Sequence, residues 1–466
     1  MRKASRLVRV RVQLSTTDGQ KGELVMTERM TADSGCPAGA ERLDSLDGVS
    51  FIDPAIQQRP FAYYRTLRED APIHFEKDLG MYLVSRHEDL EAVLRDPVVF
   101  SQELGYYKQM AHGYLDEMKE ILEHQGGGFF PDVANIDPPR HTRVRRLLSQ
   151  AFSRKRMKSL EPQFEQLVDG LIDTFVEHGE VDGLHELALP MAIAFSMQQL
   201  QVDDLDMSTI KRWGSAYLSQ FSLTNTQEDM IRAAHELAEM QNYLIALVRR
   251  RMDEPEDDML SDIITARTPD EEPLSFEELV ATARALLINT HDSMSTAFSN
   301  ILFQVATNPD IAMQFYDAAG DDSLMGRFVE ELLRLEPPVR ALSRVTTEPV
   351  TLGQKALPKG AHLLVLFASA NDDESVFECP RQFDPSRFNI RKSMTFGAGV
   401  HLCLGVSLAR MQLLVAARQT ARRLRHLSLA IPVDDIRYIP NAALLAMEKL
   451  PLTFVPRSEV GRADDM

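Results

Sequence analysis

The fold of this 466-residue chain is decided by the stretch Phe396-Gly397-Ala398-Gly399-Val400-His401-Leu402-Cys403-Leu404-Gly405. The stretch holds one cysteine, Cys403, and leads into a segment of helical pattern that runs to Leu424. A thiolate placed there lies near the positive end of the helix, where backbone N–H groups lack partners and can bond to it. The glycines lack a Cβ, so the loop can bend sharply and a flat ligand can approach the backbone. With Phe396 covering the sulfur, the sequence predicts a shielded thiolate beside a flat ligand.

A thiolate held in this way suits the axial position of a haem iron. The alternative is a structural cysteine buried in a glycine-rich loop. Zinc is not indicated, because His401 and Cys403 are closer than the usual ligand pairs and the chain offers no second Cys/His pair. The order of Phe, two glycines, His, Cys and a further Gly resembles the haem-binding loop of the cytochrome P450 family. The resemblance covers roughly residues 51–456 and implies haem b as the cofactor. The residues it places at the haem are the iron ligand Cys403 and, around it, Phe396, Gly397 and Gly405.

Composition excludes several classes of function. The formal net charge of −18 argues against nucleic acid as a partner, and no basic cluster with interleaved aromatics opposes this. No apolar run approaches the ~20 residues that a helix needs to cross a bilayer, so no membrane span is expected. Cys36, Cys379 and Cys403 are far apart in sequence, which fits a reducing compartment without a disulfide framework. We expect a cytoplasmic monomer.

Residues 1–50 are expected to form a disordered extension, and residues 51–466 a single haem domain. The length allows two or three domains, but no Gly/Ser-rich or Pro-rich linker divides the chain and no internal repeat occurs. The N-terminal segment is rich in arginine and poor in acids, which also fits an organelle transit peptide. We favour an extension with Met26 or Met30 as the working start, because the Arg/Val alternation in residues 7–12 is not an amphipathic helical pattern.

Helical periodicity dominates from Arg86 onward and predicts a mainly α fold with small β-sheets. The longest predicted helix runs from Phe276 to about Ala306, with Ser275 and Glu278 as a capping box and a proline after its end. Strands are predicted at residues 73–75, 81–84, 345–352, 362–367 and 452–455. The resemblance implies that these elements form the single-domain cytochrome P450 fold.

Glu331 and Arg334 lie three residues apart on one face of a predicted helix, which by itself is a routine pair. They precede the cysteine loop, and Arg387 lies between them and it. In the cytochrome P450 family a Glu, an Arg and a later Arg at matching positions form a buried charge cluster that supports the cysteine loop. The resemblance gives Glu331, Arg334 and Arg387 this role, in which losing one member leaves the others buried without partners.

His141 and Arg145 are four residues apart on a predicted helix, so they share a face and can hold carboxylates together. The family binds the haem propionates at positions that match these two, and Arg344 and His401 resemble two further propionate contacts. Cationic donors form short, charge-assisted hydrogen bonds with such groups. The alternative is a basic helix face exposed to solvent, and we expect this for the neighbouring Arg143 and Arg146.

Asp292 and Ser293 stand in the middle of an otherwise apolar predicted helix. A serine there can bond back to a carbonyl one turn earlier, which is the purely structural interpretation. In the family, an acid and an alcohol at matching positions lie beside the oxygen pocket and connect it to solvent protons. The chain departs from the family pattern, because serine replaces the usual threonine and Asn289-Thr290 replaces a pair of small residues. Thr290 either supplies a second hydroxyl or crowds the site.

Between residues 100 and 136 lies a segment whose counterpart in the family contacts substrate. Apolar side chains follow a helical stripe from Tyr107 to Leu122, and glycines 126–128 form a flexible run before two aromatics. The segment is either a lid over a lipophilic pocket or a surface helix packed on the core. Arg340 is the one fixed positive charge to consider near the substrate. The substrate-lining positions that follow from the family match are Leu286, Asn289, Thr290, Val339, Leu342 and Ala443.

These features predict a soluble haem-thiolate monooxygenase that inserts one atom of dioxygen into a lipophilic small molecule, most often as hydroxylation. The chain has no flavin or NAD fingerprint, so electrons are expected from a ferredoxin-type partner with its reductase. The residues expected to form a basic patch for an acidic ferredoxin are Arg143, Arg146, Arg391, Lys392 and Arg410. The alternatives are a peroxide-driven peroxygenase, which does not need Asp292 and Ser293, and a haem-binding sensor or carrier without turnover.

Overall fold

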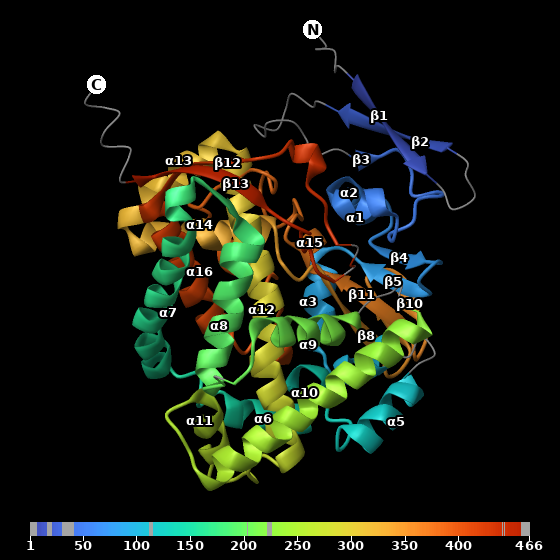
Figure 1. Cartoon of the computed structure of the whole chain (residues 1–466). Coiled ribbons are helices and arrows are strands. Elements are labelled where there is room, and N and C mark those ends of the chain that lie inside the picture. The colour runs from blue at the N-terminus through green and yellow to red at the C-terminus, as the bar shows by residue number, and fades with distance from the viewer. Residues whose placement is uncertain are drawn as a thin grey trace, which may run out of the picture.

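The computed structural model describes residues 7–15, 21–29, 42–110, 115–202, 204–220, 226–439, 441 and 443–457. Helices dominate this part of the chain and the sheets are small, as predicted (Figure 1). The helices of four or more residues in α conformation are α1 (Pro54–Gln58), α2 (Phe61–Asp70), α3 (His87–Arg95), α4 (Gln102–Met110), α5 (Leu115–Gln125), α6 (Arg140–Leu148), α7 (Arg154–Phe175), α8 (Leu189–Leu200), α9 (Met207–Ser219), α10 (Gln227–Asp253), α11 (Met259–Thr265), α12 (Phe276–Thr307), α13 (Pro309–Asp317), α14 (Asp322–Leu335), α15 (Phe367–Ala370) and α16 (Val406–Arg423).

The long helix α12 runs through the middle of the molecule (Figure 1). Its predicted capping box is present: Ser275 Oγ accepts from the Glu278 N–H at 3.2 Å, and Glu278 Oε2 accepts from the Ser275 N–H at 3.0 Å. It ends before Asn308 and Pro309, because proline cannot continue a helix. α8, α10 and α16 pack against it. Most of its side chains are therefore buried, and an interior site can be built from its middle.

In the described part of the chain, the strands form four small sheets. They are β1 (Leu7–Ser15), β2 (Lys21–Arg29), β3 (Arg42–Leu43), β4 (Ile73–Glu76), β5 (Met81–Val84), β6 (Phe100–Ser101), β7 (Glu180–Asp182), β8 (Ala341–Thr346), β9 (Val350–Leu352), β10 (Lys355–Leu357), β11 (His362–Leu366), β12 (Leu424–Leu429) and β13 (Pro451–Pro456). The largest sheet has the order β4-β5-β11-β8-β6, in which β11 pairs parallel with β5 and antiparallel with β8. The others have the orders β1-β2-β3, β12-β13-β7 and β10-β9. The strand expected at residues 345–352 is interrupted beside Pro349, where a ladder donor is missing.

The packed domain begins before the expected residue 51. Leu43 is buried, and its N–H donates to Thr66 Oγ1 of α2 at 3.0 Å. Arg42 forms ion pairs with Glu69 and Asp70 of the same helix, both at 2.6 Å. β3 also joins the antiparallel hairpin of β1 and β2 to make a three-stranded sheet (Figure 1). These contacts with distant segments are not visible in the local sequence.

The state of the cysteines differs from the expectation that the chain has no disulfide. Cys403 is free, but Cys379 is disulfide-bonded, and its partner lies outside the described residues. The expectation of no disulfide was wrong, because separation along the chain does not measure separation in the fold.

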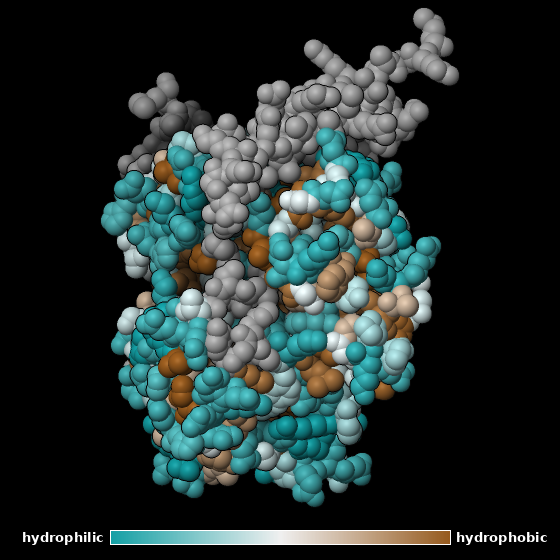
Figure 2. Space-filling model, turned by 90° about the vertical axis from the view of Figure 1, so that its right-hand side faces the viewer, coloured by the Kyte–Doolittle hydropathy of each residue, from teal (hydrophilic) through white to brown (hydrophobic). Residues whose placement is uncertain are grey.

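The surface is mainly polar where it can be seen. On the face in Figure 2, hydrophilic residues cover most of the coloured surface, and hydrophobic residues are scattered among them. Within the described ranges, no helix combines the length and the apolar composition that a membrane crossing requires.

Candidate functional site

The loop before Cys403 is folded by a backbone hydrogen bond and two left-handed glycines. The Cys403 N–H donates to Phe396 O at 2.9 Å. Gly397 and Gly399 have φ angles of 72° and 67°, which residues with a Cβ rarely adopt. A Cβ on Gly399 would lie 2.1 Å from Leu94 O, so the loop packs directly on α3. The glycines thereby hold Cys403 in a fixed place at the start of α16.

The thiol of Cys403 is accessible, yet protein surrounds it closely. Burial raises its pKa, while a hydrogen bond from the Gly405 N–H and the charges of Arg145 and Arg410 lower it. These opposing influences fit a thiol in a concave wall at the positive end of a helix. No group of three or more His, Cys, Asp or Glu side chains in the described part of the chain could hold a metal ion.

Four basic side chains that the sequence assigned to the propionates come together beside this loop. The rings of His141 and His401 have centroids 4.2 Å apart. Burial and the charge of Arg145 lower the pKa of His141 to about 4. Burial and the charges of Arg344, His141 and Arg145 lower the pKa of His401 to about 2. Burial also lowers the pKa of Arg344 to about 10, against the opposing charge of Asp137. At neutral pH the two histidines are therefore uncharged, and Arg145 and Arg344 carry the positive charge of the cluster.

The donors of this cluster fit the haem propionates. Both ring nitrogens of His141, which is 1% exposed, and Nε2 of His401 are buried with no hydrogen-bond partner among the described residues. Among the described residues, the one acceptor for the Arg344 side chain is Ser343 O, at 2.7 Å from Nη1. Buried polar groups are normally paired, and unpaired N–H donors beside two arginines are suited to carboxylates. These residues therefore fit a haem that is ligated by Cys403.

The structure also brings Glu331, Arg334 and Arg387 together. Arg334 donates to both carboxylate oxygens of Glu331, at 2.9 and 2.7 Å, and Arg387 Nε donates to Oε1 at 2.8 Å. Arg334 Nη1 also donates to Asn371 O at 2.8 Å, and Asn371 Oδ1 accepts from the Met394 N–H at 2.6 Å. The charge cluster is thus connected to the segment that enters the cysteine loop.

The hydroxyl groups in the middle of α12 bond to their own helix. Ser293 Oγ donates to Asn289 O at 3.1 Å, and Thr290 Oγ1 donates to Leu286 O at 3.4 Å, each one turn earlier. This is the bond that the structural interpretation of Ser293 described. Each hydroxyl oxygen still has a lone pair that can accept a further hydrogen bond.

One face of α12 remains accessible. Leu286, Asn289, Thr290 and Ser293 are partly or fully exposed, although most of the residues between them are buried. Their spacing of three and four residues places them on one face of the helix. Because α12 is otherwise a core helix, this face is where it can meet a bound molecule.

The sequence interpretation did not single out His291, which is buried and contacts Asp292. Its ring is 1% exposed, and Nε2 lies 3.2 Å from Asp292 Oδ2. A Cβ on Gly214 of α9 would lie 2.3 Å from that nitrogen, so a glycine there makes room for the ring. Burial lowers the pKa of His291, but the carboxylate of Asp292 outweighs it and the pKa is raised. A histidine beside an acid in an apolar helix was a visible signal, whereas nothing in the sequence pointed to Gly214.

The remaining substrate candidates lie at the sheet side. Val339 forms a β-bridge with Leu444, and the Arg340 N–H donates to Ala443 O at 2.6 Å. Leu342 lies on β8, two residues before the arginine of the cationic cluster and hence on the same strand face. Val339 and Leu342 are partly exposed, whereas Ala443 is buried. The candidates thus form two groups, one on α12 and one at the start of β8.

The segment expected to be a lid contains α4 and α5, and residues 111–114 of its stripe lie outside the described residues. The N–H groups of Gly126 and Gly128 donate to Leu122 O at 2.8 and 3.0 Å, which ends α5. Gln241 Nε2 of α10 donates to the carbonyls of both glycines at 2.6 Å. The glycine run, expected to be flexible, is a turn held by a buried side chain.

Comparison with known proteins points to one family. The family model described as Cytochrome P450 matches residues 118–454. The chain is 31% identical over 416 residues to cytochrome P450 107B1 of Saccharopolyspora erythraea, covering 87% of this chain and 97% of that protein. It is 31% identical over 398 residues to 6-deoxyerythronolide B hydroxylase of the same organism, covering 84% and 95%. The solved structure of cytochrome P450 CYP109Q5 from Chondromyces apiculatus matches with a TM-score of 0.76 and 26% identity, covering 88% of this chain and 99% of that chain.

Proposed function

Because this chain belongs to the cytochrome P450 family, we propose that it hydroxylates a lipophilic small molecule with electrons from a ferredoxin and its reductase. The family makes the chain an oxidoreductase with haem b as its cofactor. The observation that carries the proposal is the free, accessible Cys403 beside a buried basic cluster in which both ring nitrogens of His141 and Nε2 of His401 have no hydrogen-bond partner among the described residues. One relative is named as a hydroxylase, which supports hydroxylation as the reaction.

Haem b, when bound, supplies the oxygen chemistry, and the chain holds and orients it. Cys403 provides the thiolate, whose charge the Gly405 N–H and two nearby arginines stabilise. His141 and Arg344 are buried donors for the propionates, and pairing with those carboxylates compensates for their desolvation. The backbone carbonyl of Phe396 holds Cys403 in place by accepting a hydrogen bond from its N–H.

Asp292 and Ser293 are proposed to move protons to the site. The side chain of Asp292 is 25% exposed, so its carboxylate can exchange protons with solvent. Ser293 Oγ lies on the accessible face of α12 and can accept a proton while it donates its own to a neighbour. Leu286, Val339 and Leu342 supply apolar surface, which supports a lipophilic substrate because its burial is favourable.

The test is turnover by the holoprotein. Compounds that shift the haem absorbance band are supplied with a ferredoxin, its reductase and NADPH, and oxygen, NADPH and product are measured. We expect substrate-dependent consumption, and Ser293→Ala should divert electrons to peroxide and lower product per NADPH. Ser299→Ala is the matched control, because its buried hydroxyl on the same helix has no hydrogen-bond partner in the described structure.

Two results would overturn the proposal. Product formation from peroxide alone, without ferredoxin-driven turnover, would favour a peroxygenase. Ligand binding that never leads to oxygen consumption would favour a sensor or carrier. If Ser293→Ala behaves like the control, Thr290 or water carries the proton instead.

A further inference from the structure

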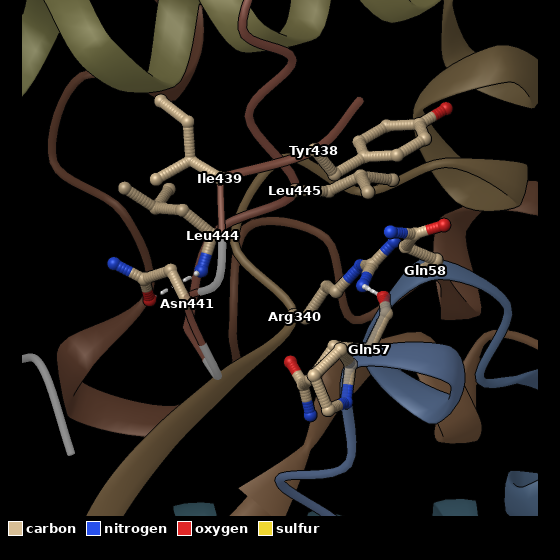
Figure 3. A pocket seen from close by; sticks show the side chains of 9 residues that line it. Gln57, Gln58, Arg340, Tyr438, Ile439, Asn441, Leu444 and Leu445 are labelled. Carbon is tan, nitrogen blue, oxygen red and sulfur yellow. Dashed lines mark hydrogen bonds between the residues drawn. The ribbon is translucent and has the colours of Figure 1, made fainter. Parts of the chain in front are cut away.

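A small pocket lies between α1 and the C-terminal loop, away from the cysteine loop in sequence. Its wall includes Gln57, Gln58, Arg340, Tyr438 and Leu444. Figure 3 shows the guanidinium of Arg340 facing Gln57 and Gln58 of α1, with Tyr438 across from it. The cavity volume of about 20 Å³ is close to that of one or two water molecules. The pocket therefore has room for one small polar group.

Arg340 is a buried charge with no acid paired to it among the described residues. The residue is 3% exposed, and Nη1 donates to Gln57 O at 2.7 Å. Among the described residues, no carboxylate forms an ion pair with Arg340. The bond to Gln57 O is the one hydrogen bond of its side chain to these residues. Glu336 is near enough to affect it electrostatically, but Glu336 Oε1 lies 2.5 Å from Arg381 Nη2. The acid in its vicinity is thus paired with another arginine.

A buried guanidinium in this state is unfavourable. Arginine stays protonated in proteins and offers five N–H donors. The carbonyl of Gln57 pairs with one of them. A buried charge without its partner is strongly destabilising, whereas a bidentate carboxylate compensates for the lost hydration. We propose that this pocket is a binding site for one oxyanion group of carboxylate size, held by Arg340. The small volume of the pocket suits a group of this size.

The oxyanion has two possible sources with the same chemistry. Val339, a proposed substrate-lining residue, precedes Arg340 and bridges to Leu444 of the pocket wall, so the carboxylate of a substrate is one source. A free small carboxylate is the other. Binding of an oxyanion does not depend on the proposed reaction, and only its assignment to a substrate rests on the proposed function.

The first experiment measures the melting temperature of the holoprotein with increasing acetate, at constant ionic strength kept with chloride. Acetate should stabilise the wild type, and Arg340→Gln should abolish the effect. Arg59→Gln is the matched control, because Arg59 is a nearby arginine whose side chain is 77% exposed, paired with Asp434 at 3.1 Å. Acetate should stabilise this variant as it does the wild type. An equal response in Arg340→Gln and the wild type would overturn the proposal.

Arg340→Lys keeps the measurement decisive if Arg340→Gln fails to fold. An ammonium cannot form the bidentate bond, so acetate should stabilise this variant less than the wild type. An unchanged response would overturn the site.

The second experiment distinguishes the sources by titrating dodecanoate and dodecanol into the holoprotein and following the haem absorbance band. If the oxyanion belongs to a substrate, dodecanoate should bind about tenfold more tightly than dodecanol. Arg340→Gln should remove the preference. Acetate stabilisation without that preference assigns the site to a free anion. A preference that persists in Arg340→Gln contradicts a substrate carboxylate at Arg340.

Discussion

Gly399 meets two separate requirements at the cysteine loop. Its φ of 67° lies in the left-handed region, and a Cβ would lie 2.1 Å from Leu94 O. Gly360 has a similar φ of 77°, but a Cβ there would have no neighbour within 4 Å. A comparison of the two glycines therefore separates backbone strain from close packing.

We predict that Gly360→Ala lowers the free energy of unfolding by about 1–2 kcal/mol, the cost of a left-handed residue with a Cβ. Gly399→Ala should cost more and should lower haem retention, because the loop has to move away from α3. Denaturant unfolding of the holoprotein and the ratio of haem to protein absorbance measure the two effects. Equal losses in both variants would show that the contact with Leu94 is unimportant.

His291 should make stability depend on pH. Burial opposes its protonation, but the Asp292 carboxylate raises the pKa of His291 above its ordinary value of 6.5. The stabilisation by the protonated ring is then fully present below about pH 6.5 and is lost as the pH rises through the raised pKa. His291→Gln should therefore lower the melting temperature more near pH 6 than near pH 9. The difference should disappear in an Asp292→Asn background, and a loss independent of pH would contradict this account.

At the scale of elements, α14 carries two adjacent glutamates in different environments. Glu331 is buried and bonded to both Arg334 and Arg387. Glu330 is partly exposed and pairs with Arg410 at 2.5 Å. The same chemical change at the two positions therefore tests the buried cluster against a surface ion pair.

Glu331→Gln should lower the free energy of unfolding by about 3–5 kcal/mol, because it leaves two buried guanidinium groups without their acid. Glu330→Gln should cost about 0–1 kcal/mol, as is usual for surface pairs. Denaturant unfolding of the two holoproteins measures this. Similar losses at both positions would mean that the buried cluster does not support the fold as described.

Elements whose signals are local could be predicted. Apolar periodicity predicts helices over residues 227–252 and 323–335, and α10 and α14 begin and end within one residue of these bounds. α8 was missed because Met191, Ile193 and Phe195 are buried on different sides of it, so it shows no polar face. The pattern predicts a helix that begins at Leu160, because proline is tolerated in the first turn, but α7 begins at Arg154 and Pro162 lies further inside it.

At the scale of the whole molecule, the structure changes the view of the expected basic patch. Three of its five members are neutralised by glutamates. The pairs are Arg143 with Glu278 at 2.5 Å, Arg146 with Glu271 at 2.6 Å and Arg410 with Glu330 at 2.5 Å. Arg391 and Lys392 are exposed and have no ion pair with any described residue. On a chain of net charge −18, these two are the better candidates for attracting an acidic ferredoxin.

Reduction by an acidic ferredoxin should slow as salt rises, because attraction is screened over about 8 Å at physiological ionic strength. The double variant Arg391→Glu, Lys392→Glu should slow reduction and weaken its dependence on salt. Arg146→Glu is the control and should have a smaller effect. Stopped-flow reduction of the haem measures the rates, and a double variant that equals the wild type would contradict docking at this segment.

Contacts between distant segments account for what the sequence could not provide. Cys403 and His141 could be chosen from residue type and spacing, because their chemistry is visible in short motifs, whereas Arg344 followed from the resemblance to the cytochrome P450 family. Their gathering depends on packing, such as that of Gly105, where a Cβ would lie 2.9 Å from Arg344 Cα. The disulfide of Cys379 likewise depends on which segments meet in the fold.

The central claim is that Cys403 is the thiolate ligand of the haem iron. The most direct measurement is the absorbance spectrum of the reduced, carbon monoxide-bound protein, recorded for the wild type, Cys403→His and the control Cys379→Ser. The wild type and Cys379→Ser should show the red-shifted band of thiolate ligation, and Cys403→His should lack it. Persistence of that band in Cys403→His would contradict the account.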